Sequence, residues 1–324
     1  MKSLLSFQGP RIPSGGIAET GSIMITTIRS YVREHMLTAQ IFSFAVIVLT
    51  LIAADVLYPS TEVFLIVLVL LAVMNAKVRA FAIDFAPFIL LIYSYDTLRN
   101  FADDLTRADI HITDLIAWER ALFGGTLPSY WLQQNLWDLP ITPLLDTLTN
   151  TLYLSHFMSP LVLAGLLWRR GPGEYWAFAL GLVALSYAGF ATYLAFPAAP
   201  PWWATHHGYL IRTPITLDHF VVPAEVVSAG PNPVAAMPSL HTAYPTYIAL
   251  VSLATWGRRA LPVILLPLGV AFSTFYLGHH WVIDALAGAG YALFFFGTAF
   301  LFFRRHQMSL AWLNKVKRTV VPHT

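Results

Sequence analysis

The segment His280-Trp281-Val282-Ile283-Asp284 opens an apolar run that continues to about residue 303, and Pro238-Ser239-Leu240-His241 opens another run earlier in the chain. Apolar runs of this length are typical of helices that cross a membrane. Residues four apart on a helix lie on one face about one turn from each other, so we expect His280 and Asp284 to be neighbours. A carboxylate there can hold one imidazole nitrogen and leave the other free to act as a nucleophile.

The composition is that of an integral membrane protein. Of the 324 residues, 57% are hydrophobic and 11% are charged, whereas about 25% of the residues in a typical soluble domain are charged. The chain contains 14 Tyr and 10 Trp, the amphipathic aromatic residues that gather at lipid interfaces. It has no cysteine, which excludes disulfides and thiolate metal sites.

Eight apolar runs approach or reach the length of a membrane span, which predicts an all-α, polytopic membrane helical bundle. The runs cover residues 36–57, 60–76, 80–98, 142–168, 174–196, 241–257, 260–277 and 281–303. The second run is short and the third contains Asp84, so the last five are the most regular. The polar segment before the first run is long for a signal peptide and no clear cleavage site follows that run, so we expect a retained span.

The same map divides the chain into four parts. We expect a cytoplasmic tail over residues 1–35, an N-terminal span pair over 36–79, a membrane domain over 80–303 and a basic cytoplasmic tail over 304–324. If both termini are cytoplasmic, 15 of the 19 Lys and Arg residues lie on the inner side. The positive-inside rule therefore predicts this orientation for eight spans.

Two long loops, 99–141 and 197–240, then lie on the outer side. The first is acidic and contains an apolar stretch over 110–123 that we expect to lie flat in the membrane interface as an amphipathic helix. The second is rich in Pro and Trp, a composition that favours stiff, irregular backbone.

This orientation places His241, His280, Asp284 and Arg99 at the same, outer, membrane surface. Together they fit the needs of phosphoryl transfer: a nucleophile, an acid for the leaving oxygen, and donors for the phosphate oxygens. We expect His280 to be the nucleophile, Asp284 to fix its tautomer, and His241 to act first as acid and then as base. Ser239 and the helix start behind it can donate to phosphate, and Arg99 can balance its charge.

Other interpretations use the same residues. Arg99 could snorkel or pair with a nearby aspartate, and a single histidine at a helix end is more often an interface residue. His279 is expected to pack or to face the interface, and the mid-span His156 to hydrogen-bond between helices. A membrane transporter with a His-lined outer site is a competing function, although the charged residues gather at span ends rather than along a midplane path.

The motifs resemble those of the type-2 phosphatidic acid phosphatase superfamily, whose pattern is K-x6-R-P, then P-S-G-H, then S-R-x5-H-x3-D. The second motif here is Pro238-Ser239-Leu240-His241, with Leu in place of Gly. The third begins at Ser273-Thr274, with Thr in place of Arg, and continues to His280 and Asp284. The first motif is missing in its usual form, and Tyr95-Asp96-Thr97-Leu98-Arg99 is the nearest candidate.

The departures point to one branch of that superfamily. Ala-Met-Pro-Ser-Leu-His at 236–241 and Tyr-Leu-Gly-His-His-Trp-Val-Ile-Asp at 276–284 look like the inositol phosphorylceramide synthase branch. That resemblance covers about residues 80–303 and implies a bundle with a six-helix core, a triad of His241, His280 and Asp284, and no metal or other cofactor.

The resemblance thus implies a metal-independent enzyme that acts on a lipid phosphoester and whose partners are membrane lipids, not nucleic acid. It favours an inositolphosphotransferase-like enzyme that moves a phospho-headgroup to a lipid or alcohol acceptor through a phosphohistidine. A lipid phosphate phosphatase is the alternative, because the same phosphohistidine can be resolved by water.

Overall fold

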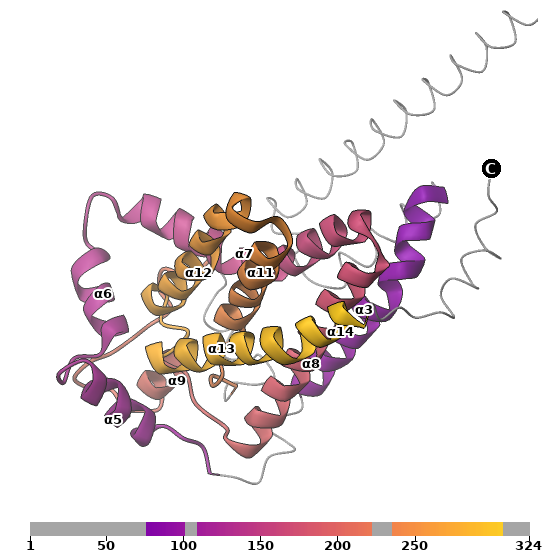
Figure 1. Ribbon diagram of the computed structural model, residues 1–324. Coiled ribbons are helices and arrows are strands. Elements are labelled where there is room, and N and C mark those ends of the chain that lie inside the picture. The colour runs from indigo at the N-terminus through magenta and orange to yellow at the C-terminus, as the bar shows by residue number, and fades with distance from the viewer. Residues whose placement is uncertain (1–75, 101–108, 222–234, 307–324) are drawn as a thin grey trace, which may run out of the picture. The chain divides into compact units, whose positions relative to one another are not determined.

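The computed structural model describes residues 76–100, 109–221 and 235–306 (Figure 1). The predicted spans 36–57 and 60–76 lie outside these residues, apart from Ala76, as do the tail 1–35 and most of the tail 304–324. Residues 83–324 form one compact unit, which contains every element discussed below except the start of the first helix. Within the described residues the regular elements are all helices, which confirms the predicted all-α fold.

Four stretches are long and apolar enough to cross a membrane, and they are built from the following elements. The first two are single helices, α7 (Thr142–Arg170) and α8 (Pro172–Ala195). The third joins α11 (Leu240–Trp256), the 3-10 helix η1 (Gly257–Ile264) and α12 (Leu265–Tyr276). The fourth joins α13 (Val282–Phe295), the π-helical η2 (Phe296–Phe300) and α14 (Leu301–Arg305).

The stretch Leu240–Tyr276 folds back on itself, because α11 and α12 pack against each other. Gly257 ends α11 with a φ of 60°, a left-handed conformation that glycine adopts without steric cost. This break separates the predicted runs 241–257 and 260–277. The predicted third run falls in α3 (Ala76–Asn100), whose apolar part is Ala82–Ser94. The total of eight spans stays a prediction.

Short helices occupy the segments predicted as outer loops and gather at one end of the molecule (Figure 1). They are α5 (Thr113–Leu122), α6 (Pro128–Leu136) and α9 (Pro201–His206). Both α6 and α9 start with proline, whose fixed φ and missing N–H suit the first helical position. Helix α5 lies within the stretch 110–123, where the sequence predicted a helix.

Helix α5 has one face toward the protein and one away from it. Leu115 and Ile116 are buried, whereas Trp118 and Leu122 are 47% and 59% exposed. The exposed apolar side chains suit a helix lying in the membrane interface, and that location stays a prediction.

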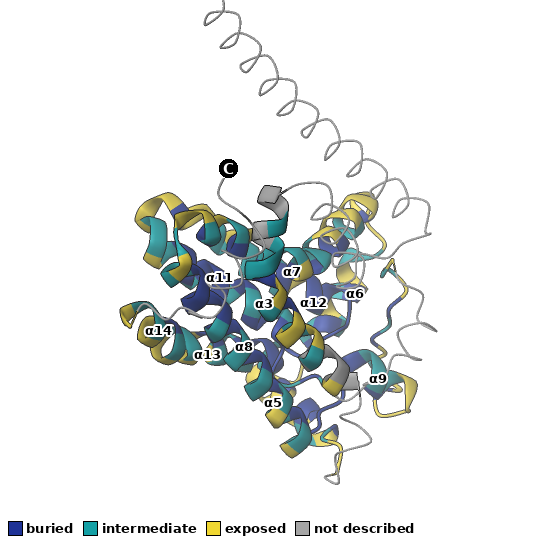
Figure 2. Cartoon of the chain, turned by 90° about the vertical axis from the view of Figure 1, so that its right-hand side faces the viewer, coloured by how far each residue is buried: buried dark blue, intermediate teal, exposed yellow. Residues whose placement is uncertain are grey.

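The buried residues lie where the long helices meet (Figure 2). Helix α8 is the most enclosed of the four spanning stretches, with half of its apolar window buried. A separate apolar cluster lies beneath α5 and α9 and surrounds Trp281, which is fully buried. The indole N–H of Trp281 donates to the carbonyl of Ala199 at 2.9 Å. This contact fixes the start of α13 against the second outer loop.

Candidate active site

His241, His280 and Asp284 lie in a row at the adjoining starts of α11 and α13. Nδ1 of His241 is 2.9 Å from Nε2 of His280. The other ring nitrogen of His280, Nδ1, is 3.3 Å from Oδ2 of Asp284. The structure therefore brings together the three side chains that were predicted to act as a unit, while their roles stay a prediction.

The reason His280 meets Asp284 differs from the one inferred from the sequence. His280 precedes the helix: α13 begins at Val282, Trp281 is its N-cap, and Asp284 is its third residue. The Asp284 carboxylate folds back over the helix start and accepts the Trp281 N–H at 3.0 Å. Their proximity comes from helix capping and not from two side chains on one helix face, so that part of the interpretation was wrong.

A turn after α12 fixes the backbone of both adjacent histidines. The carbonyl of Thr274 accepts the N–H of His279 at 2.8 Å and that of His280 at 3.3 Å. Gly278 within the turn has a φ of 75°, and a Cβ there would lie 2.9 Å from the carbonyl oxygen of Thr216. Thr274 stands where the superfamily pattern has arginine, and it binds the two histidines through its backbone carbonyl.

The two histidine motifs are joined through their backbones. The N–H of Ser239 donates to the carbonyl of Asp284 at 3.0 Å, which links the N-cap of α11 to the first turn of α13. A Cβ on Gly288 would lie 2.2 Å from the Ser239 carbonyl oxygen, so the helices touch here without a side chain between them. Leu240, next to Ser239, packs on α8, where a Cβ on Gly189 would lie 3.1 Å from its Cδ2.

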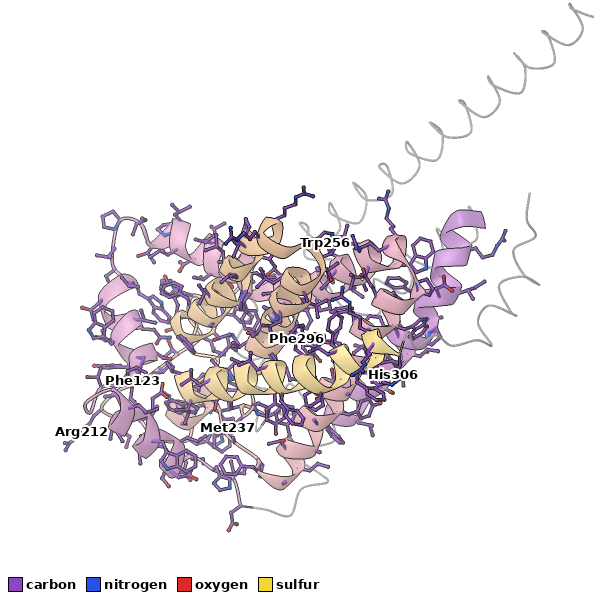
Figure 3. All side chains as sticks on the ribbon, in the orientation of Figure 1. Phe123, Arg212, Met237, Trp256, Phe296 and His306 are labelled. Atoms are coloured by element: carbon purple, nitrogen blue, oxygen red, sulfur yellow. The ribbon has the colours of Figure 1, made fainter. Side chains whose placement is uncertain are left out.

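Of the two residues predicted to bind phosphate, the structure describes the side chain of Ser239 but not that of Arg99. The Ser239 side chain is fully buried, and its Oγ lies 3.4 Å from Oγ1 of Thr242. Arg99 lies in the last turn of α3, and its side chain is outside the described part of the chain. Of the other outer basic residues, Arg120 and Arg212 are exposed, and Arg212 points away from the protein (Figure 3). The roles of Ser239 and Arg99 therefore stay predictions.

Aromatic side chains enclose the histidines on the α7 side. Tyr153 stacks on His241 with ring centroids 4.6 Å apart and lies the same distance from His279. Phe220 of the second outer loop contacts Tyr153 and His279. His156 packs on His241 at 4.1 Å, and its Nδ1 lies 2.5 Å from the Tyr153 carbonyl oxygen. Neither Tyr153 nor Phe220 was singled out from the sequence, although Tyr153 lies one helical turn before His156.

His279 packs among these rings, as expected, and differs from His280 in its electrostatics. The pKa of His279 is lowered to about 3, chiefly by burial and additionally by positive charge on His280 and His156. His279 is therefore neutral at physiological pH.

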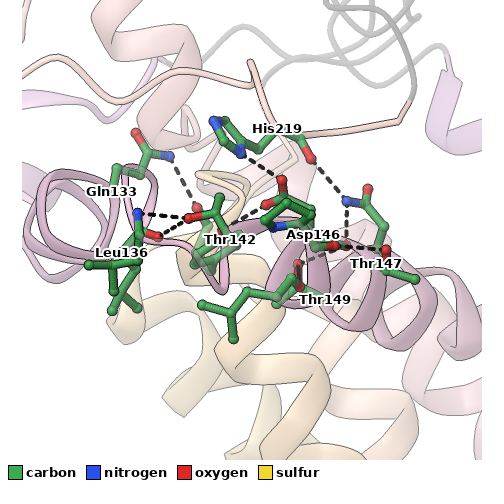
Figure 4. Close-up of polar contacts among 12 residues, drawn as sticks. Gln133, Leu136, Thr142, Asp146, Thr147, Thr149 and His219 are labelled. Carbon is green, nitrogen blue, oxygen red and sulfur yellow. Dashed lines mark hydrogen bonds and ion pairs between the residues drawn. The ribbon is translucent and has the colours of Figure 1, made fainter.

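A second polar cluster holds the outer segment that contains Phe220. The Asp146 carboxylate lies 2.8 Å from Nδ1 of His219 and accepts the Tyr276 hydroxyl at 2.6 Å (Figure 4). The Asn150 side chain binds the same segment on both sides, donating to the His219 carbonyl at 2.9 Å and accepting the Val221 N–H at 3.0 Å. These contacts keep Phe220 over Tyr153 and His279.

A buried glutamate from the first outer loop binds the start of α13. Oε1 of Glu119 accepts the Val282 N–H at 2.9 Å, and Oε2 accepts the Ile283 N–H at 3.3 Å. The pKa of Glu119 is raised to about 7, chiefly by burial and to a smaller extent by the charge of Asp284, against the lowering effect of these two N–H groups. From the sequence Glu119 was one acidic residue of an acidic loop, and its contact with α13 was not foreseen.

Among the side chains that the structure describes, no group of three or more His, Asp or Glu residues is arranged to hold a metal ion. The expectation of a reaction without metal stays a prediction.

Residues 113–298 match the family model of the PAP2 superfamily. A helical membrane bundle with two histidines and an aspartate at its helix starts suits that class, and the chain belongs to the PAP2 superfamily. The match begins at α5 and ends within η2, so it includes every residue of the site described above except those of α3.

Three relatives carry the names of the predicted branch. The chain is 28% identical to the phosphoinositol dihydroceramide synthase of Bacteroides thetaiotaomicron over 236 aligned residues. The alignment covers 66% of this chain and 75% of the relative. It is 25% identical over 284 residues to the inositol phosphorylceramide synthase of Candida albicans, covering 82% of this chain and 58% of the relative. The Schizosaccharomyces pombe inositol phosphorylceramide synthase catalytic subunit is 26% identical over 220 residues, 61% of this chain and 49% of the relative. The chain thus spans about half the length of the fungal relatives, and no solved structure matches it.

Proposed function

We propose that this chain is a membrane lipid phosphotransferase that moves inositol phosphate from a phosphoinositol-containing lipid to the hydroxyl of a ceramide-type lipid. The observation that carries the proposal is the row of Asp284, His280 and His241, with 2.9 Å between the two histidine nitrogens. The names of the three relatives support the transferred group and the acceptor.

The row of contacts supports one assignment of the protons. With Asp284 holding the N–H at Nδ1 of His280, Nε2 of that ring carries a lone pair. The hydrogen bond of 2.9 Å then runs from the Nδ1–H of His241 to that lone pair. In this assignment His280 is the nucleophile and His241 the acid, and the substrate phosphorus replaces the direct contact between the rings when it binds.

The reaction proceeds in two balanced steps. In the first, Nε2 of His280 bonds to phosphorus, the bond from phosphorus to the donor lipid oxygen breaks, and His241, which enters the step as an imidazolium ion, gives one proton to that oxygen and becomes neutral. In the second, neutral His241 takes the proton of the acceptor hydroxyl, the hydroxyl oxygen bonds to phosphorus, and the bond between phosphorus and His280 breaks. Both rings return to their starting states. Arg99, Ser239 and the N–H groups at the start of α11 are our candidates for binding the phosphate oxygens.

The function is tested by following the labelled headgroup. Purified protein in lipid nanodiscs is given a phosphoinositol lipid labelled in its phosphate, with and without a ceramide, and the products are separated into lipid and water-soluble fractions. We expect the label to move to the ceramide only when the ceramide is present. Release of water-soluble label at the same rate in both samples would instead support hydrolysis, the reaction of a phosphatase-like enzyme.

We also propose that the site faces away from the cytoplasm, which is supported by the distribution of Lys and Arg along the chain. The chain has no cysteine, so single cysteines can be introduced without a background. Ile211 is 82% exposed in the second outer loop, and Arg258 is exposed in η1. In intact cells we expect Ile211→Cys to react with an impermeant thiol reagent and Arg258→Cys to react only after the membrane is opened. The reverse pattern would overturn the orientation.

A further inference from the structure

Glu119 is the most unusual acidic residue outside the proposed triad. It lies on α5, whose outward side chains Trp118 and Leu122 are exposed, yet Glu119 itself has no exposed surface. Fully buried carboxylates are rare unless they are paired. Here the partners are two backbone N–H groups at the start of α13, where free N–H groups and the helix dipole both favour negative charge.

Glu119 and Asp284 share the free N–H groups of the first turn of α13. Asp284 accepts the N–H of Trp281, and Glu119 accepts the N–H groups of Val282 and Ile283. The Asp284 carboxylate is thus left beside His280, and its Oδ1 has no hydrogen-bond partner among the described protein atoms. Without Glu119, the two vacated N–H groups would lack their acceptors, and Asp284 is an acid in the same helical turn whose charge already acts on Glu119.

The contact between Asp284 and His280 is open to such competition. At 3.3 Å it is longer than the 3.0 Å contact of the same carboxylate with the Trp281 N–H. A small rotation of the Asp284 side chain toward the backbone would break the contact with His280. The imidazole would then lose the group that fixes its tautomer.

We propose that Glu119 is a positioning residue for the transfer reaction: by occupying the N–H groups of Val282 and Ile283, it keeps the Asp284 carboxylate on His280. The proposal rests on the function proposed above, because it acts through the same row of residues. It also gives α5, a helix of the first outer loop, a part in the chemistry although it contributes no side chain to the row.

A double-mutant cycle distinguishes positioning from a purely structural role. Glu119→Gln keeps the size of the side chain but offers one acceptor oxygen in place of two. We expect it to lower the rate of transfer about tenfold in the native chain, with little change in KM, and by less than about twofold in an Asp284→Asn background. Asp114→Asn is the matched control, since Asp114 is on the same helix and pairs with His111, where both side chains are partly exposed. It should leave the rate within about twofold of the native chain in both backgrounds.

The pH profile supplies a second readout. The native chain should lose activity as the pH falls through about 7, because protonated Glu119 no longer offers two negatively charged acceptors. Asp284 is the charged group that acts on Glu119 from α13, and it titrates in both proteins. The acidic limb that is present in the native chain and absent in Glu119→Gln therefore reports on Glu119.

Stability should follow the opposite trend. Because the folded-state pKa is raised, the stability that Glu119 contributes is fully present below pH 4.5 and is lost as the pH rises through about 7. The melting temperature of the native chain, relative to that of Glu119→Gln, should therefore fall over this range while its relative activity rises. A structural residue would change stability and activity in the same direction.

The outcomes separate this proposal from the proposed function. If the native chain transfers headgroup and the effects of Glu119→Gln and Asp284→Asn simply multiply, Glu119 does not act through Asp284 and the proposal is wrong. If the native chain does not transfer but hydrolyses, the same cycle is measured on hydrolysis, and the proposed function fails alone. A Glu119→Gln protein with native rate and native pH profile would also overturn the proposal.

Discussion

Replacing His280 with alanine should abolish headgroup transfer, with a loss of at least about 10³-fold in kcat, because the attacking imidazole is removed while His241 is still needed as the acid. Asp284→Asn should leave a small residue of activity. The nucleophile persists, but an amide can present an N–H to the ring and stabilise the wrong tautomer. A loss of about 10²–10⁴-fold is the expected order for such a change.

The covalent intermediate gives this prediction a direct measurement. When the donor lipid is labelled in its phosphate and the acceptor is omitted, labelled inositol phosphate should accumulate on His280, bonded through phosphorus, in a form that is labile in acid. His207→Ala is a suitable control, because His207 is exposed on the same side of the protein, next to α9, and packs on Trp203 outside the row. Full activity in His280→Ala, or labelled phosphate on another residue, would contradict the mechanism.

Replacing Gly288 with alanine adds a single methyl group and should lower both the stability of the protein and its transfer activity. That Cβ would lie 2.2 Å from the Ser239 carbonyl oxygen, which belongs to the backbone and cannot rotate away. Helices α11 and α13 would have to separate where His241 faces His280. Overpacking of this kind destabilises proteins by about 1–3 kcal/mol, and the displaced histidines should lower transfer by more than about tenfold, as small displacements of reacting groups do.

Gly290→Ala is the matched control for that experiment. It lies on the same helix, and a Cβ at Gly290 would meet no atom within 4 Å. Alanine is favoured over glycine in a helix by up to about 1 kcal/mol, so this variant should be as stable as the native chain or more so. The prediction is tested by measuring the thermal unfolding and the transfer rates of Gly288→Ala and Gly290→Ala. Equal behaviour of the two would mean that α11 and α13 do not approach as closely as described.

Within the residues that the structure describes, most of the membrane-spanning pattern could be predicted from hydropathy alone. The runs 142–168 and 174–196 became α7 and α8 with ends that differ by only a few residues. Hydropathy succeeds here because a helix in lipid must satisfy its own backbone and present apolar side chains along its whole length. The predicted runs 36–57 and 60–76 lie almost entirely outside the described residues.

The three residues of the row could be found because their spacing and their positions at span ends were visible in the sequence. The way they are held could not. His280 meets Asp284 through a capped helix start, and that depends on the loop that follows α12. Glu119 reaches α13 from far away in the chain, so no local pattern shows the contact. Tyr153 and Phe220 are ordinary aromatic residues until α7 and the second outer loop place them around the histidines.

The backbone link between Ser239 and Asp284 has a bearing on how this motif can vary during evolution. Since N–H and carbonyl groups form the link, exchange of the side chain at position 240 does not remove it. A leucine can therefore replace the glycine of the superfamily pattern, provided that the facing helix makes room for it. In this chain the room is at Gly189. Among descendants of a common ancestor, we expect a large residue at position 240 to be inherited together with a small one at position 189.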